Sequence, residues 1–433
     1  MNGKPSTIPG LPEVFASIKV PRRGGFLRKL LAFAGPAYLV SVGYMDPGNW
    51  ATDIEGGARF GYRLLWVLLF SNVMAIFLQT LAARLGLATR KDLAQASRDY
   101  YPSWAAIPLW FLCEVAIIAC DLAEVLGGAI GIHLLTGLPL LPSVLLMAGD
   151  VFILLVMQQL GWRWIEAVVV LFVAATMTCF AVELFIAHPD WSAAAAGLTH
   201  VSLDHESLYV AIAIIGATVM PHNLYLHSAL VQTRAVARNR RDIAQAARFN
   251  VADSLVALNL AFLVNAAILI MAAATFHSHG LVISELSQAH DLLNPLLGST
   301  IAAPVFAIAL ICSGQSSTLT VTLAGQIVMS GFLDLQVAPW LRRLVTRLLA
   351  VGPAAAIVAW QGESGGYRLL IFSQVILSLQ LPFAVFPLVQ FTSDPAKMGR
   401  LVNPGWVKAL AWLMAWAIVA LNVWLVVQAV SPA

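Results

Sequence analysis

The sequence has 433 residues, of which 60% are hydrophobic and only 11% are charged, and its formal net charge is +3. Soluble domains carry about 25% charged residues, so this composition excludes an ordinary soluble protein and indicates one that crosses the membrane many times. The apolar runs are continuous and do not alternate, which favours a bundle of α-helices over a β-barrel. We therefore expect an all-α polytopic membrane protein.

Eleven membrane-spanning helices are predicted, because a helix of roughly 20 apolar residues is long enough to cross a bilayer. They cover residues 30–57, 61–85, 104–133, 140–160, 163–186, 206–236, 246–277, 297–330, 338–358, 366–390 and 404–430. Residues 1–29 are expected to form a cytosolic tail, and the segments between the spans are too short for a soluble domain.

The Lys and Arg residues, 25 in total, predict the orientation of the chain. If the N-terminus is cytosolic, all of them except Arg59, Arg63 and Arg368 fall on the cytosolic side, where positive residues are enriched in membrane proteins. An N-terminus inside and a C-terminus outside also fit an odd number of spans. We expect a multi-pass monomer in the cell membrane, either the inner or the plasma membrane.

Two of the predicted spans contain a proline next to polar side chains. The first span holds DPGN at residues 46–49, and the sixth holds MPHN at residues 220–223. Proline removes a backbone donor, and the carbonyls that it frees inside a membrane must find partners. One such proline is usually a kink, but two at matched positions favour unwound helices that line a binding site.

The two breaks divide the chain into halves of opposite topology. Residues 30–190 and 206–390 would each form a five-helix unit with an interrupted first helix, and the second unit would be inverted relative to the first. This is a plan that secondary transporters use. The eleventh helix, 404–430, would then lie at the periphery.

The side chains at the breaks suit a metal ion. Asp46 offers a carboxylate oxygen and Asn49 an amide oxygen, and unwinding would add backbone carbonyls from Gly43 and Ala217. The thioether of Met220 is soft, so it favours ions such as Mn²⁺ or Fe²⁺ over Mg²⁺ and Ca²⁺, which prefer oxygen ligands. The residues predict a selective divalent-metal site of moderate affinity.

Three further residues are candidates near the site. His222 is a possible additional ligand, a proton-carrying group, or a donor that supports the ligands from behind. His227 lies on the half-helix after the second break, where it fits a water-filled exit or a proton route. Gln374, in the tenth span, could close over the metal from outside.

The third span carries three acids. Glu114, Asp121 and Glu124 are spaced so that they share one helical face, and such acids must face the interior of the bundle. Arg342 and Arg343, at the start of the ninth span, could balance their charge. These groups are either proton carriers or a static network of ion pairs, and the arginines could also be anchors on the cytosolic side.

The four cysteines lie within apolar runs and are not in CxxC spacing. A free buried cysteine behaves as a small hydrophobic residue. We therefore interpret Cys113, Cys120, Cys179 and Cys312 as core residues rather than as metal ligands or disulfide partners.

The DPGN and MPH motifs together resemble the hallmark sequences of the Nramp family (natural resistance-associated macrophage proteins), the proton-coupled divalent-metal transporters. The resemblance extends over nearly the whole chain, and the short tails are similar to those of a prokaryotic member. It implies a LeuT-like fold with a 5+5 inverted repeat. It also implies import of Mn²⁺ or Fe²⁺, and of Cd²⁺, together with protons and without a permanent cofactor.

The same resemblance assigns roles to residues of this chain. It places the metal ligands at Asp46, Asn49, Met220 and the carbonyl of Ala217, and it puts Gly43 where family members often carry alanine. A magnesium-transporting branch departs from the methionine motif, so Met220 argues against that branch. The acids of the third span and the two arginines would form a proton route to the cytosol, in which Asp121 and Glu124 are favoured over Glu114.

Other function classes fit less well. A sodium-coupled amino-acid or amine symporter could share this architecture, but Asp46 would repel the carboxylate of an amino acid. A channel has no use for paired inverted breaks, and the sequence has no selectivity-filter repeat. An enzyme is disfavoured because no nucleophile constellation, P-loop or dinucleotide fingerprint is present.

Overall fold

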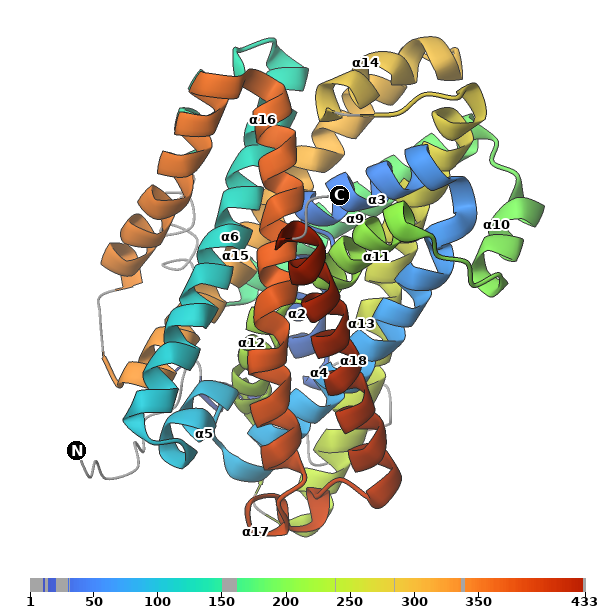
Figure 1. The fold of residues 1–433 in the computed structure, drawn as a ribbon. Helices are drawn as coiled ribbons and strands as arrows, with labels where there is room; N and C mark the ends of the chain where they lie inside the picture. Colours follow the sequence, from blue (N-terminus) through green and yellow to red (C-terminus); the bar gives the residue numbers. More distant parts are fainter. Residues whose placement is uncertain are drawn as a thin grey trace.

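The computed structural model describes residues 11, 15–20, 30, 32–149, 162–237, 239–283, 285–335 and 339–430. Nearly all of these residues are helical, and the long helices run side by side along the length of one bundle (Figure 1). This agrees with the predicted all-α membrane protein.

The helices of the first half of the chain begin with two short pieces that replace one predicted span. They are α2 (Pro36–Gly43), α3 (Pro47–Phe60), α4 (Leu65–Thr89), α5 (Leu93–Tyr100), α6 (Ser103–Thr136), α7 (Leu140–Met147) and α9 (Trp162–Ala187), with the 3-10 turn η2 (Gly61–Leu64) between α3 and α4. The predicted span 140–160 lies outside the described residues from residue 150 onward.

The second half of the chain begins in the same way, with two short helices in place of one span. Its helices are α10 (Trp191–Thr199), α11 (His205–Thr218), α12 (Pro221–Leu230), α13 (Arg240–Thr275), α14 (Leu286–Leu297), α15 (Ala302–Leu333), α16 (Pro339–Thr392), α17 (Pro395–Met398) and α18 (Gly405–Val430). The 3-10 turns η3 (Val231–Thr233), η4 (His277–His279) and η5 (Gly399–Leu401) join them. The only described strands, β1 (Ile18–Lys19) and β2 (Arg234–Ala235), pair in parallel.

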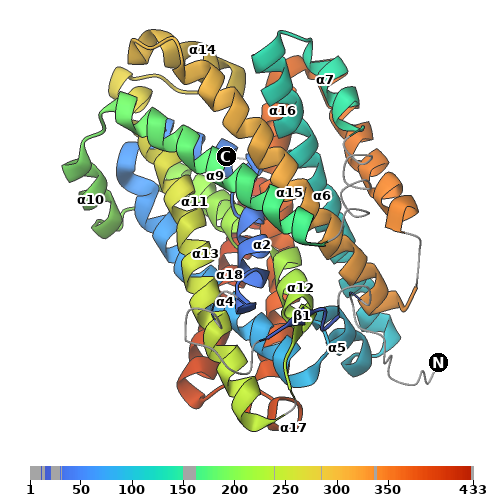
Figure 2. The same cartoon turned by 180° about the vertical axis from the view of Figure 1, so that it is seen from behind.

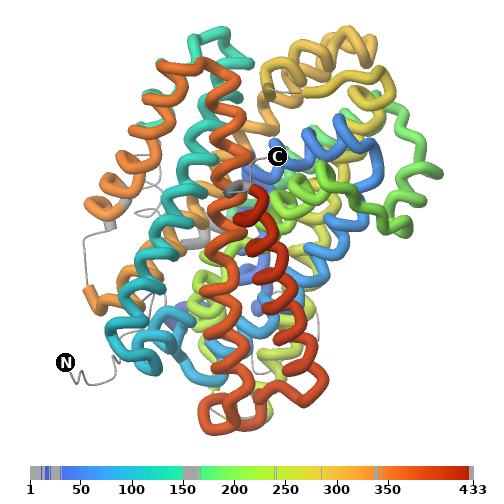
Figure 3. The backbone as a smooth tube through the Cα atoms, in the orientation of Figure 1, coloured from blue at the N-terminus to red at the C-terminus, as the bar shows by residue number. Residues whose placement is uncertain are grey.

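Eight helical stretches of the described residues are long and apolar enough to cross a membrane. The stretch 47–89 takes in the span 61–85 and the second part of the span 30–57, and the stretch 340–392 takes in two of the predicted spans. Glycines with positive φ separate the paired spans, Gly61 in the first case (φ 61°) and Gly362 in the second (φ 68°). Figure 3 shows the sharp bend within α16 and α18 running along its second half.

The two predicted helix breaks are confirmed. α2 ends at Gly43 and α3 begins at Pro47, while α11 ends at Thr218 and α12 begins at Pro221. Each proline stands at the first position of its helix, where its missing N–H costs nothing and its fixed φ suits the helix. The chain around each proline is extended, since Asp46 has ψ 164° and Met220 has ψ 124°.

Small residues bring α6 close to the first break. A Cβ atom at Gly127 would lie 2.1 Å from the ring of Pro47, so only glycine allows α6 to touch the start of α3. Further along, Gly128 of α6 meets Gly314 of α15 backbone to backbone, which is the close helix packing that small residues permit in membranes. The break is thereby enclosed by α6 and α15.

The short helices lie at the two ends of the bundle. α5 and α17 are at one end, and α14 caps the opposite end, with α10 near it (Figures 1 and 2). α10 lies between two predicted spans, and all of α14 except its last residue does too. α14 is amphipathic and buries Leu286, Ala289 and Leu293, so packing of one apolar face stabilises it where propensity alone would not.

Candidate functional site

The two breaks meet at Asp46 and Asn49. Asp46 caps α3, because its Oδ1 accepts hydrogen bonds from the backbone N–H of Asn49 at 2.8 Å and from Asn49 Nδ2 at 2.7 Å. The same Nδ2 donates to the backbone oxygen of Ala217 at 3.1 Å, at the end of α11. Asp46 and Ala217 are 0% exposed and Asn49 is 1% exposed. The structure thus brings three of the four predicted metal ligands together.

Asn49 is oriented differently from the prediction. We expected its amide oxygen to face the site, but its amide nitrogen faces the oxygens of Asp46 and Ala217. The Asn49 oxygen instead accepts a hydrogen bond of 3.4 Å from Asn265 of α13. Asp46 Oδ1 and Ala217 O both accept from Asn49 Nδ2, so a cation could take the position of this nitrogen between the two oxygens. The Asn49 amide must rotate by half a turn for its own oxygen to become a third ligand.

Met220 and Gly43 lie on either side of Asn223. Met220 is fully buried at the start of α12, and its Sδ accepts a 3.6 Å hydrogen bond from Asn223 Nδ2. The same nitrogen would lie 2.6 Å from a Cβ atom at Gly43. Gly43 therefore lets the end of α2 approach α12 closely, and Met220 stands at the second break as predicted.

Cys120 of α6 is a residue to which the sequence assigned no function. Its Sγ lies 3.9 Å from Asp46 Oδ2, 3.9 Å from Glu124 Oε1 and 3.9 Å from His222 Nε2. All four side chains are buried. The structure thus places His222 and Glu124 beside the site through this thiol. The signal in the sequence was the spacing, since Cys120 and Glu124 are one helical turn apart.

Other helices close the site from further sides. A Cβ atom at Gly48 would lie 1.8 Å from Gln374 Nε2, so Gln374 of α16 covers the first turn of α3. Asn265 of α13 donates to Tyr44 O at 2.8 Å, and Ser313 of α15 donates to Met45 O. Asn265 and Ser313 hold the unwound backbone and were not anticipated.

Two of the three acids of α6 are paired with arginines of α16, one of them the predicted Arg342. Glu114 forms an ion pair with Arg342, with N···O distances of 3.0 and 3.1 Å, and Asp121 pairs with Arg347 at 2.5 Å. The side chain of Arg343 lies outside the described residues. Arg347, one helical turn beyond Arg343, was not among the predicted partners.

His227 belongs to a separate chain of hydrogen bonds. Its Nδ1 is 3.0 Å from Gln79 Oε1, and its Nε2 is 3.3 Å from Asn250 Oδ1. Gln79 in turn donates to the hydroxyl of Tyr44 at 2.8 Å. These contacts run from the end of α2 to α13, so His227 is placed away from the acids of α6.

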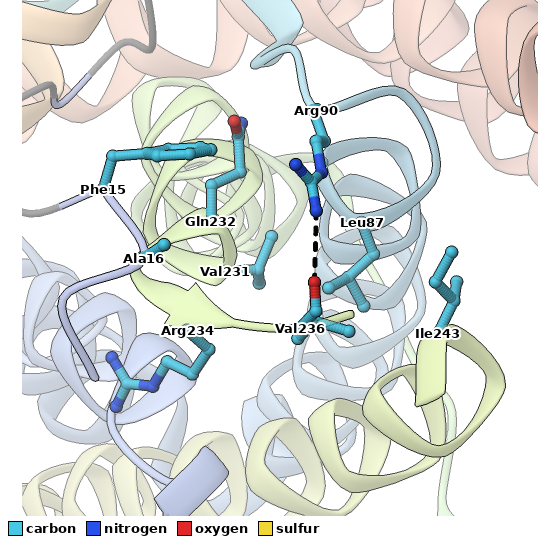
Figure 4. Close-up of a pocket in the computed structure, with 10 residues that line it drawn as sticks. Phe15, Ala16, Leu87, Arg90, Val231, Gln232, Arg234, Val236 and Ile243 are labelled. Atoms are coloured by element: carbon cyan, nitrogen blue, oxygen red, sulfur yellow. Dashed lines mark hydrogen bonds between the residues drawn. The ribbon is translucent and has the colours of Figure 1, made fainter. Parts of the chain in front are cut away.

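A second hollow lies beyond the end of α12 (Figure 4). It is lined by Leu87 and Val231 and by the arginines Arg90 and Arg234, and Arg90 donates to the backbone oxygen of Val236 at 3.1 Å. No carboxylate is among the described residues that line it. Its positive charge makes it unsuitable for a cation.

Comparison with known proteins agrees with this geometry. The family model described as natural resistance-associated macrophage protein-like matches residues 37–428. A protein of Nostoc sp. named divalent metal cation transporter MntH is 54% identical over 428 residues, with 98% of this chain and 97% of the relative covered. A protein of the same name from Listeria welshimeri is 50% identical over 432 residues, with 99% of this chain and 96% of the relative covered.

Solved structures show the same architecture. The Eremococcus coleocola manganese transporter has a TM-score of 0.89 and 38% sequence identity, and the match covers 95% of this chain and 89% of that one. Mhp1, a nucleobase-cation-symport-1 family transporter, has a TM-score of 0.61 at 14% identity, which shows a shared LeuT-like fold only. The relatives are transporters and not enzymes. This chain belongs to the natural resistance-associated macrophage protein (Nramp) family.

Proposed function

We propose that this protein transports divalent metal cations across the membrane, importing Mn²⁺ or Fe²⁺, and also Cd²⁺, together with protons. The observation that carries the proposal is the convergence of Asp46 Oδ1 and Ala217 O on the Asn49 amide, where the two broken helices meet. The names of the relatives, a divalent metal cation transporter and a manganese transporter, support the same substrate class.

The charge at the site supports a cation as the substrate. Among the ion pairs of the described residues, Glu114 and Asp121 each have an arginine, whereas none involves Asp46 or Glu124. A buried carboxylate without a positive partner is costly, so it must hold a proton or a metal ion. Asp46 therefore supplies the charge that attracts a divalent cation, and Met220 supplies the softer donor that would distinguish Mn²⁺ from Ca²⁺.

The sealed state of the site supports alternating access. The predicted ligands are at most 1% exposed, so an ion held there cannot reach either side without movement of the surrounding helices. The short helices α2, α3, α11 and α12 are separated by unwound backbone, which can absorb changes in φ and ψ as a hinge does. We propose that the half-helices on each side open in turn.

A proton route along α6 is part of the proposal. From Asp46 the contacts lead through Cys120 to Glu124, and one turn further the face of α6 carries Asp121 paired with Arg347. Glu114, paired with Arg342, follows nearer the end that holds α5. Titratable groups within reach along one face are what a proton relay needs inside a membrane.

The sodium-coupled amino-acid symporter is the weaker candidate. A substrate carboxylate would need free backbone N–H groups at the start of α3. Asp46 already accepts from the backbone N–H of Asn49, so the protein's own carboxylate takes that place. The geometry favours a positive substrate over a negative one.

The test is uptake of Mn²⁺ into proteoliposomes that contain the purified protein, with the internal pH recorded. Asp46→Ala should abolish uptake because it removes the charge of the site and the cap of α3 together. Asp46→Asn keeps the cap and removes only the charge, so it separates the two effects. If Asp46→Asn transports Mn²⁺ as the unchanged protein does, the site assignment is wrong.

A further inference from the structure

We propose that the sulfur of Cys120 is a further metal-binding group of the site and that it raises the preference for thiophilic divalent cations such as Cd²⁺. The inference rests on the proposed transport function and deepens it, because it concerns which ions the site prefers. It replaces our interpretation of Cys120 as a mere core residue.

The placement of Cys120 carries the first part of the argument. Its side chain is 0% exposed and lies on the face of α6 that points at the first break. Asp46 Oδ2, Glu124 Oε1 and His222 Nε2 stand at the same distance, 3.9 Å, from its Sγ. The thiol thus lies between the carboxylate of α3, the imidazole of α12 and its own neighbour on α6.

The distance from Cys120 Sγ to Asp46 Oδ2 is close to the separation expected of two ligands on one ion. With metal–sulfur and metal–oxygen bonds of about 2.3 and 2.1 Å and a tetrahedral angle, the two ligand atoms lie about 3.6 Å apart. The observed distance is 3.9 Å. A small approach of the two side chains therefore brings both atoms within bonding distance of one metal ion.

Two side chains that contact the thiol each carry a polar atom without a partner. Among the described residues, neither His222 Nδ1 nor Glu124 Oε2 makes a hydrogen bond, and both side chains are fully buried. The atoms that contact the thiol are His222 Nε2 and Glu124 Oε1. Buried polar atoms are nearly always satisfied, so each side chain keeps an unused donor or acceptor that a turn of the side chain would bring toward an ion at Cys120.

The chemical nature of the Cys120 sulfur determines which divalent cations the site would prefer. Asp46 and the Ala217 carbonyl are hard oxygen donors, which bind Mn²⁺ well, whereas thiol and thioether sulfur favour softer ions. With Cys120 on α6 and Met220 on α12, the site presents sulfur from two separate helices. Cd²⁺ gains more from the second sulfur than Mn²⁺ does.

The experiment compares Cd²⁺ and Mn²⁺ uptake by Cys120→Ser and the unchanged protein in proteoliposomes. We expect the KM for Cd²⁺ to rise about tenfold and that for Mn²⁺ by less than about threefold, because a hydroxyl oxygen replaces the sulfur. Cys179→Ser is the matched control, since this half-buried cysteine of α9 makes no described contact with the site and should leave the ratio of the two KM values unchanged.

The outcomes separate this inference from the proposed function. If the unchanged protein transports neither ion, the proposed function fails. If it transports both and Cys120→Ser leaves the ratio of the two KM values as it was, only the role of Cys120 is overturned.

A binding measurement covers the case in which Cys120→Ser transports poorly. A background protein with Cys113→Ala, Cys179→Ser and Cys312→Ser keeps Cys120 as its single cysteine. Titration of this protein in detergent with Cd²⁺ should produce an ultraviolet sulfur-to-cadmium charge-transfer band. Adding Cys120→Ser should remove the band, and a band of equal strength after that change contradicts the proposal.

Discussion

At the scale of residues, Asp46 and the three acids of α6 fall into two groups. Glu114 and Asp121 are each held by an arginine of α16, whereas Asp46 and Glu124 have no ion-pair partner among the described residues. An arginine fixes the charge of its partner, because removing either member leaves an uncompensated buried charge. In the proposed function, the unpaired acids exchange a proton or a metal ion, and the paired ones set the charge along the proposed proton route.

Asp121→Asn tests the route. The change removes the negative charge beside Arg347 but keeps an oxygen that can accept its hydrogen bond. We expect the metal-dependent fall of internal pH to decrease more than the rate of Mn²⁺ uptake, both measured in the same proteoliposomes. An equal decrease of both rates indicates that Asp121 only holds α6 and α16 together.

Met220→Ala tests the soft donor. The oxygen ligands remain, so Mn²⁺ uptake should continue at a reduced rate, but Ca²⁺ should become a stronger competitor, by about tenfold in the concentration that halves uptake. The measurement is inhibition of Mn²⁺ uptake by increasing Ca²⁺. Unchanged inhibition by Ca²⁺ means that Met220 only fills space.

The sequence predicted the residues of the site better than their partners. Asp46, Pro47 and Pro221 act within a few positions of the chain, so the breaks follow from local chemistry. The orientation of the Asn49 amide depends on an oxygen 168 residues away, and the thiol of Cys120 meets a carboxylate 74 residues away. Such contacts depend on how helices pack, which the spacing of residues in one helix does not specify.

At the scale of elements, α5 shows how a short helix is held at the end of the bundle, outside the membrane-spanning segments. Asp92 caps it, with its Oδ1 accepting from the N–H of Gln95 at 2.8 Å, and Gln95 Oε1 accepts in return from the N–H of Asp92 at 3.2 Å. Leu93 N donates to Ser228 Oγ at 2.9 Å, which ties α5 to α12. This helix was not predicted from the sequence, although the residues of the capping box are present in KDLAQ.

Burial makes the stability of this cap depend on pH. Burial raises the pKa of Asp92 from its ordinary 3.8 to about 7, against the hydrogen bonds that would lower it. Because the folded pKa lies above the unfolded one, the folded state binds the proton more tightly. The stabilisation of the folded state by protonated Asp92 is complete below about pH 4 and is lost as the pH rises through 7.

Asp92→Asn keeps a capping oxygen and removes the titration. We expect the Tm of the unchanged protein to fall between pH 5.5 and 8 relative to the Tm of the variant, measured by thermal denaturation in detergent. Parallel curves for the two proteins across this range would show that Asp92 does not titrate there.

At the scale of the whole molecule, the pairing of the breaks was the most informative pattern. Two prolines in matched spans predicted the interrupted helices α2–α3 and α11–α12. They also predicted the inverted-repeat fold, which this chain shares with Mhp1 at only 14% sequence identity. The short helices α10 and α14 were missed because they lie in polar connections and depend on tertiary packing. The bends at Gly61 and Gly362 also join helices that hydropathy alone separates.

The orientation of the molecule can be tested with single cysteines placed at the two ends of a cysteine-free chain. The positive residues predict that a label which cannot cross the membrane reacts at the C-terminus from outside intact cells. The N-terminus should react only after the cells are opened. Labelling of both ends from outside would contradict the predicted odd number of spans.

The cap of α3 has a consequence for how long an ion stays. Asp46 Oδ1 accepts from the backbone N–H of Asn49 as well as from its amide, so turning the amide over frees this oxygen only in part, while Oδ2 lies 3.9 Å from Cys120 Sγ. An incoming metal that binds Oδ1 must therefore share it with the first turn of α3. Because α3 competes with the metal ion for Asp46, the ion should stay bound for a shorter time, which favours rapid turnover over storage.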